Sequence, residues 1–171
     1  MFSDSLLLIS NDDSKSSAAS IVGTIQWILE QATLKKIPIK GAIAYGEQTA
    51  DFDKSLHFGR PLIDAFDLQG ELLLYGVVLH HTMEKYLIDG NLISILENKD
   101  IYKWPTPMKS GKVTHYIIDW INTAFKPKET KETIPLLYCN VSGTPRKYVD
   151  NTFDFMNWLD KRKAELAKDK K

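Results

Sequence analysis

Residues 37–67 constrain the fold of this chain more than any other segment. They open with an apolar stretch, interrupted by Gly41 and Gly46, that is typical of a strand. A polar stretch over 48–55 predicts a loop, and Pro61 marks the first turn of the short helix that follows. The segment therefore predicts a strand, a loop and a helix in succession, the beginning of a domain that mixes helices and strands.

Hydrophobic periodicity extends this pattern along the chain. Helices are expected over 16–36, 60–68, 82–87 and from Pro145 onward, where Thr144 is the expected cap and Val149, Thr152, Phe153, Met156 and Leu159 form an inward stripe. Strands are expected over 6–9, 37–47, 72–80, 101–104, 113–120 and 134–141, and a charged loop over 126–133. No internal repeat or low-complexity linker interrupts the chain, so we predict a single α+β domain over 1–171 with a mixed or antiparallel sheet.

Composition excludes several classes of protein. Hydrophobic residues make up 43% and charged residues 26%, which excludes wholesale disorder. Lys plus Arg and Asp plus Glu number 22 each, so no overall field attracts nucleic acid or an anionic membrane. No apolar run is long enough to span a bilayer. The single cysteine, Cys139, allows no internal disulfide and is expected to be a buried, inert thiol in a cytoplasmic protein.

Two segments suggest ligand chemistry. Asp4 lies between Ser3 and Ser5, where a carboxylate could bind Mg²⁺ held by substrate phosphates, although one carboxylate alone makes a weak metal site. Gly41 and Gly46 have the spacing of a phosphate-binding loop, but the residue that follows is Glu47, whose charge repels phosphate. These glycines instead let the strand pass close to a neighbouring backbone or a ligand.

Other polar residues admit two interpretations. Asp64 and Asp67 share a helix face and form either a binding pair or, the favoured alternative, a solvated face. His80 and His81 point to opposite sides if the strand continues through them, so they cannot ligate one metal together. The segment 142–147 could hold an anion at a helix start, although a cap with surface charge is favoured. The four tryptophans are expected to be core or interface anchors: Trp27, Trp104, Trp120 and Trp158.

The order of elements resembles one family. The segments that carry the resemblance are Phe2-Ser3-Asp4-Ser5-Leu6, the long helix, residues 40–46 and the helix start at 58–65. Together they resemble the catalytic domain of class III nucleotidyl cyclases, and most closely the divergent bacterial branch that includes pyrimidine cyclases of antiphage defence. The resemblance covers roughly the first half of the chain.

This resemblance implies a ferredoxin-like sheet with helices packed on one face, a homodimer, and binding of a nucleoside triphosphate with Mg²⁺ or Mn²⁺. It makes Asp4 a metal ligand and assigns nucleotide contacts to Ser3, Ser5, Gly41, Phe58, Gly59 and Asp64. The family's other metal-binding aspartate belongs to a strand that would precede residue 1, so the domain is expected to lack its first strand. The family's asparagine and arginine correspond here to Ile63 and Asp67.

Two functions follow from these expectations. In the first, the chain binds a nucleoside triphosphate with a divalent metal and forms a cyclic nucleotide. In the second, it is a catalytically inactive, cyclase-like interaction or scaffold module.

Overall fold

The structure is a computed structural model that describes residues 5–51, 53–54, 56–122 and 125–169. The helices are α1 (Lys15–Leu34), α2 (Arg60–Glu71), α3 (His81–Asp89), α4 (Ile93–Leu96), α5 (Pro127–Thr133), the 3-10 helix η1 (Ile134–Asn140) and α6 (Arg146–Lys168). The strands are β1 (Lys40–Ile43), β2 (Gln48–Asp51), β3 (Leu56–Gly59), β4 (Gly76–Leu79), β5 (Ile101–Met108) and β6 (Gly111–Ile118). Among the described helices, none has the length and apolar character that crossing a membrane requires.

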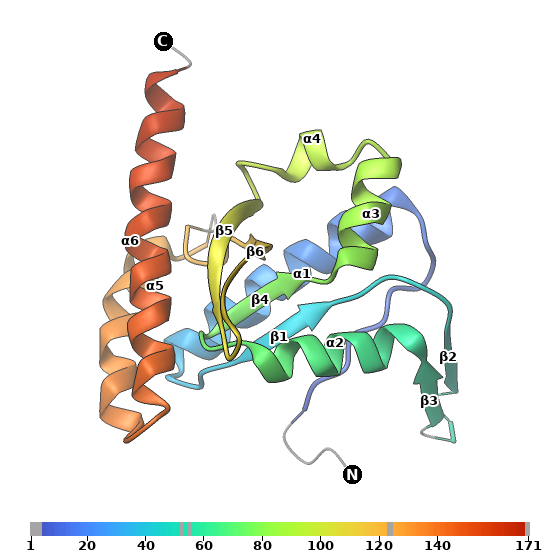
Figure 1. The fold of residues 1–171 in the computed structure, drawn as a ribbon, viewed down its shortest axis with the longest axis horizontal. Helices are drawn as coiled ribbons and strands as arrows, with labels where there is room; N and C mark the ends of the chain where they lie inside the picture. Colours follow the sequence, from blue (N-terminus) through green and yellow to red (C-terminus); the bar gives the residue numbers. More distant parts are fainter. Residues whose placement is uncertain (1–4, 52, 55, 123–124, 170–171) are drawn as a thin grey trace.

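A mixed sheet with the strand order β1-β4-β6-β5 organises the molecule (Figure 1). β1 and β4 are parallel, whereas β6 is antiparallel to both β4 and β5. Every residue of β4 is buried, which is expected of a strand with neighbours on both edges and side chains packed on both faces. The predicted α+β, ferredoxin-like fold is confirmed. β2 and β3 form a separate antiparallel hairpin.

Helix α1 forms where its apolar positions recur every three or four residues. Ser14 caps it by accepting a hydrogen bond from the N–H of Ser17, at 3.2 Å. Val22, Ile25 and Leu29 are buried in the core beneath the sheet, as the periodicity predicts.

Helix α6 lies beside the β5–β6 hairpin, with α5 and η1 next to it (Figure 1). Its buried stripe is Val149, Thr152, Phe155, Met156 and Leu159, so Phe155 takes the core position that the sequence assigned to Phe153. The predicted Thr144 cap is wrong, because Pro145 precedes the first helical residue and no side chain caps the helix.

Two predicted strands are absent. Residues 5–10 have no regular structure, and Leu6 and Leu7 are exposed, although Leu8 packs against the core. Residues 134–140 form η1 instead of the predicted last strand, since Pro135 fits the first turn of a helix. Cys139 is exposed there, which corrects its predicted burial.

Two predicted loops are regular structure. The charged segment over 126–133 is helix α5, which Pro127 begins and the buried Thr130 holds to the protein. The polar stretch over 48–55 contains β2 and the start of the β2–β3 turn. Charge and polarity predicted exposure at both places, but exposed segments also form helices and hairpins.

Candidate functional site

The residues predicted to bind a nucleotide do not converge on one pocket in the described structure. Ser3 and Asp4 lie outside the described residues, and Ser5 is exposed in a segment without regular structure. Gly41 lies in β1, whereas Phe58 and Gly59 end β3. The expected juxtaposition of Asp4 with the glycine-flanked strand therefore stays a prediction.

Close packing accounts for two of these glycines. A Cβ on Gly41 would lie 3.2 Å from Cγ2 of Val77 on the neighbouring strand. A Cβ on Gly59 would lie 2.7 Å from the carbonyl oxygen of Glu47, closer than real Cβ atoms approach backbone. Gly59 therefore lets the hairpin close on itself, and Phe58, which precedes it, is exposed.

Polar and aromatic side chains gather where the parallel strands β1 and β4 end. Just beyond β1, the N–H of Tyr45 donates to Oγ1 of Thr82, at 3.0 Å. Just beyond β4, the rings of His80 and His81 lie 4.0 Å apart between centroids. The prediction that these histidines point apart is wrong, because β4 ends at Leu79 and strand alternation stops there.

Helix α2 adds an ion pair to this edge. Nε of Arg60 donates to Oδ1 of Asp64 at 2.7 Å, and their side chains are 80% and 10% exposed. Asp67 is exposed, so the two aspartates of this helix have different surroundings and do not form one solvated pair. We call Tyr45, Arg60, Asp64, His80, His81 and Thr82 the strand-end cluster.

His80 favours its neutral form. Burial is the main cause that lowers the pKa of its imidazole, followed by the neighbouring His81, while Asp64 acts in the opposite direction. His115 and Arg60 also lower this pKa, with smaller effects. The N–H of Thr82 points at Nδ1 of His80 at 3.5 Å, so the unprotonated nitrogen serves as the cap of α3.

The described residues do not supply a metal site. No group of three or more His, Cys, Asp or Glu side chains among them is arranged to hold a metal ion. The predicted binding of Mg²⁺ or Mn²⁺ therefore depends on Asp4, which lies outside the described residues.

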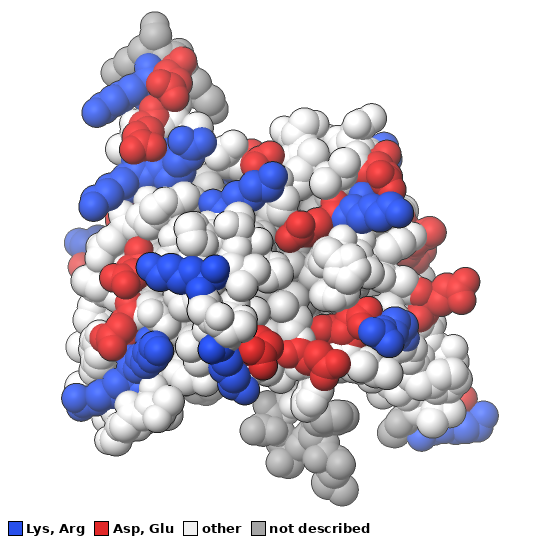
Figure 2. Space-filling model, viewed as in Figure 1, with Lys and Arg blue, Asp and Glu red and all other residues white. Residues whose placement is uncertain are grey.

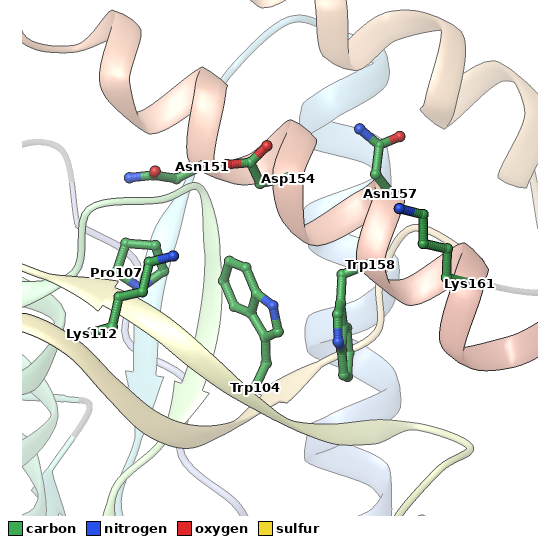
Figure 3. Close-up of a pocket in the computed structure, with 8 residues that line it drawn as sticks. All are labelled: Trp104, Pro107, Lys112, Asn151, Asp154, Asn157, Trp158 and Lys161. Carbon is green, nitrogen blue, oxygen red and sulfur yellow. The ribbon is translucent and has the colours of Figure 1, made fainter. Parts of the chain in front are cut away.

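A groove that the sequence did not reveal lies between α6 and the β5–β6 hairpin (Figure 3). It encloses about 370 Å³ and is lined by Trp104, Pro107, Lys112, Asn151, Asp154, Asn157, Trp158 and Lys161. Trp104 rises from β5 and Trp158 descends from α6, with ring centroids 6.4 Å apart. The remaining side chains are polar groups on the rim, apart from Pro107.

A second hollow of about 410 Å³ shares the Trp158 wall and is lined by Glu97, Asn98, Tyr102, Lys103, Trp158, Arg162 and Glu165. Sequence reasoning missed both because the two tryptophans are far apart in the chain. The available signal was Trp158 itself, a large aromatic side chain that lies at helical spacing among the Asn, Asp and Lys residues of an otherwise polar helix face.

Lys and Arg intermingle with Asp and Glu over the face shown in Figure 2. No field of one sign covers that face. This distribution agrees with the equal totals of acidic and basic residues.

The chain was compared with protein-family models, with curated proteins and with solved structures. None of these comparisons gives a match.

Proposed function

We propose that this chain is a nucleotide-binding domain related to class III nucleotidyl cyclases, and that the strand-end cluster binds a nucleoside triphosphate. The observation that carries the proposal is the meeting of a cation, two histidines and an aromatic side chain beyond the ends of β1 and β4. Ligands of sheets with parallel strands commonly bind at this edge, because the connections there carry variable side chains. The element order that resembles the cyclases supports the same class of ligand.

Each group has a role in this proposal. Arg60 uses Nε for Asp64 and extends into solvent, where its terminal N–H groups suit phosphate oxygens. His81 is exposed next to His80 and adds a second donor. Tyr45 stacks on Tyr86 with centroids 4.2 Å apart and offers its other face to a base. Stacking on an aromatic ring contributes roughly 1–3 kcal/mol per base.

Formation of a cyclic nucleotide is the part of the proposal that rests only on the resemblance to the cyclases. That reaction requires carboxylates that hold metal ions, and the described residues contain no such group. Binding and turnover are therefore separate claims with separate measurements.

Calorimetry with each nucleoside triphosphate, with and without Mn²⁺, tests binding. We expect Arg60→Ala to weaken the affinity about tenfold, the scale of one charge-assisted contact. Lys54→Ala is the matched control, because Lys54 is also an exposed cation in an ion pair with a nearby aspartate. Chromatography of the same mixtures detects a cyclic product. Absence of binding, or equal binding by both variants, would refute the proposal.

A second candidate function is an interaction module that acts as a homodimer. It is favoured by four exposed apolar side chains on the hairpin and α2: Leu56 (49% exposed), Phe58 (54%), Ile63 (53%) and Phe66 (50%). We call them the α2–hairpin surface. Exposed apolar groups that gather on one surface mark interaction sites in many proteins. Sedimentation of the wild type and of Phe58→Ser tests this candidate, which predicts a dimer that the substitution dissociates.

A further inference from the structure

The two hollows beside Trp158 form one elongated groove. Their α6 side is a single stripe that extends from Asn151 to Glu165. Fourteen helical steps of 1.5 Å make this stripe about 21 Å long, the length of roughly six residues of extended chain. The opposite side follows β5 from Tyr102 to Pro107. This shape suits a linear occupant better than a compact one.

Strand β5 borders the groove and ends the sheet. Its outward backbone groups belong to alternate residues, since groups two residues apart point the same way. The carbonyl of Ile101 accepts from the N–H of Asn98 at 2.9 Å, and the carbonyl of Pro107 accepts from the N–H of Leu73 at 3.0 Å. Both ends of the outer edge are therefore covered by the chain itself.

The middle of this edge is open. Lys103 and Pro105 lie between the covered ends, and no hydrogen bond joins their outward backbone groups to another described residue. Proline has no N–H, so the window offers one donor, from Lys103, and two acceptors, the carbonyls of Lys103 and Pro105. A strand that paired here would find three backbone partners.

We propose that an extended peptide segment of a partner protein, about six residues long, docks in this groove and pairs with β5 as a short added strand between the two covered ends of its edge. Its backbone pairs with Lys103 and Pro105, which is the usual way an open sheet edge binds a peptide. Its inward side chains pack on both sides of Trp158. Trp158 supplies the apolar contact in such a complex, and the backbone of β5 fixes the register of the peptide.

Charge in the first hollow indicates the peptide's composition. Lys112 and Lys161 line this hollow at its two ends, with the tryptophans between them (Figure 3), and no described residue forms an ion pair with either lysine. Asp154 is the carboxylate that lines the same hollow, so a surplus of one positive charge results. The peptide therefore carries an acidic residue within the first hollow and an apolar residue beside Trp158.

A displayed library of eight-residue peptides, selected on the full chain, provides the probe. We expect enriched peptides to combine apolar and acidic residues in this arrangement. The affinity of the best synthetic peptide is then measured by fluorescence polarisation for the wild type and for two variants of Lys103. Lys103→Pro removes the outward N–H, whereas Lys103→Ala keeps it and removes only the side chain. We expect at least tenfold weaker binding for the first and less than twofold change for the second.

Asn157→Trp is an independent test, because it fills the groove from an exposed position of α6. Ser20→Trp, on an exposed position of α1, is its control. Thermal unfolding of all variants confirms that they fold. The proposal is overturned if no peptide is enriched, or if the best peptide binds Lys103→Pro and Asn157→Trp as it binds the wild type. A dimer that Lys103→Pro dissociates would also overturn it, since a second copy would then be the occupant.

Discussion

Helices α6 and α2 differ in how much of their surface is buried against the rest of the protein. Helix α6 buries five residues, and Phe155 is enclosed between Trp104 and Trp158 at centroid distances of 5.1 and 6.2 Å. Helix α2 buries none of its residues and leaves Ile63 and Phe66 half exposed. One helix therefore contributes strongly to the core, and the other rests on the sheet with its outer side uncovered.

This difference shows that the two candidate binding regions rest on unequal support: the groove on a well-buried helix, and the predicted nucleotide contacts of α2 on a helix without buried residues. Burial of α6 anchors the sheet edge and fixes the walls of the groove. α2 and the adjoining hairpin instead carry three of the predicted nucleotide contacts, Phe58, Gly59 and Asp64, together with exposed apolar side chains. Regions with few buried contacts open more easily, so we expect local opening to begin at α2.

The strongest test of the contrast substitutes a phenylalanine in each region. Phe155→Ala should lower the free energy of unfolding by about 3–5 kcal/mol, because it leaves a cavity between two tryptophans. Phe58→Ala removes an exposed ring and should cost less than about 1 kcal/mol. Urea unfolding measures both values. Similar losses for the two variants would show that the hairpin belongs to the same core as α6.

Ion pairs provide the next test. Asp119 is 2% exposed and meets Nζ of Lys163, on α6, at 2.5 Å; its carboxylate also accepts from the N–H groups of Ile121 and Asn122. Asp119→Ala should destabilise the protein by about 3 kcal/mol, since it leaves buried donors without a partner. Asp64→Ala on α2 breaks a pair with the exposed Arg60 and should cost about 0.5 kcal/mol. Chemical denaturation measures the loss of unfolding free energy in each variant. A larger loss for Asp64→Ala than for Asp119→Ala would contradict this prediction.

Two glycines in the hairpin and α2 are expected to respond in opposite ways to substitution by alanine. Gly59→Ala should destabilise the hairpin by about 1–3 kcal/mol, because the new methyl group meets the backbone of Glu47 and Gln48. Gly70→Ala, inside α2, meets no atom within 4 Å and should stabilise the helix by about 0.5–1 kcal/mol. Hydrogen exchange of the α2 amides detects both changes. The prediction requires faster exchange in Gly59→Ala and slower exchange in Gly70→Ala than in the wild type.

The smallest effect concerns pH at the end of β4. The pKa of His80 is lowered in the folded protein, so the unfolded chain binds the proton more readily. The contribution of this residue to stability is present above the unfolded pKa of about 6.5 and is lost as the pH falls through that value toward the folded pKa. The groups that face it are His81, Asp64, His115 and Arg60.

His80→Asn keeps a capping side chain but cannot titrate in this range. Melting temperatures measured at neutral and mildly acidic pH should therefore fall less in the variant than in the wild type. An equal fall in both proteins would assign the pH dependence to another group.

Much of the fold could be predicted because its helices have strong periodicity. The long stripe of α1, the Pro61 start of α2 and the paired strands β5 and β6 are confirmed. Short apolar runs misled the prediction over 6–9 and 134–141. Such runs fit a strand or a helical segment equally well, and only tertiary partners decide between them.

The candidate sites were less accessible to sequence reasoning. Gly59 was found as a special position, but its close contact with Glu47 depends on a hairpin that polarity had concealed. His80 and His81 were assigned by strand alternation, which fails at the end of a strand. The groove depends on Trp104 and Trp158, which come together only when α6 packs against β5.

The prolines of β5 have a consequence for self-association. Pro105 and Pro107 withhold two of the donors that a regular strand would present, and the edge is covered on either side of the open window. The edge can hold one short guest strand but gives no template for the endless stacking of copies that produces fibrils. Such an edge can bind a peptide without promoting aggregation of the protein.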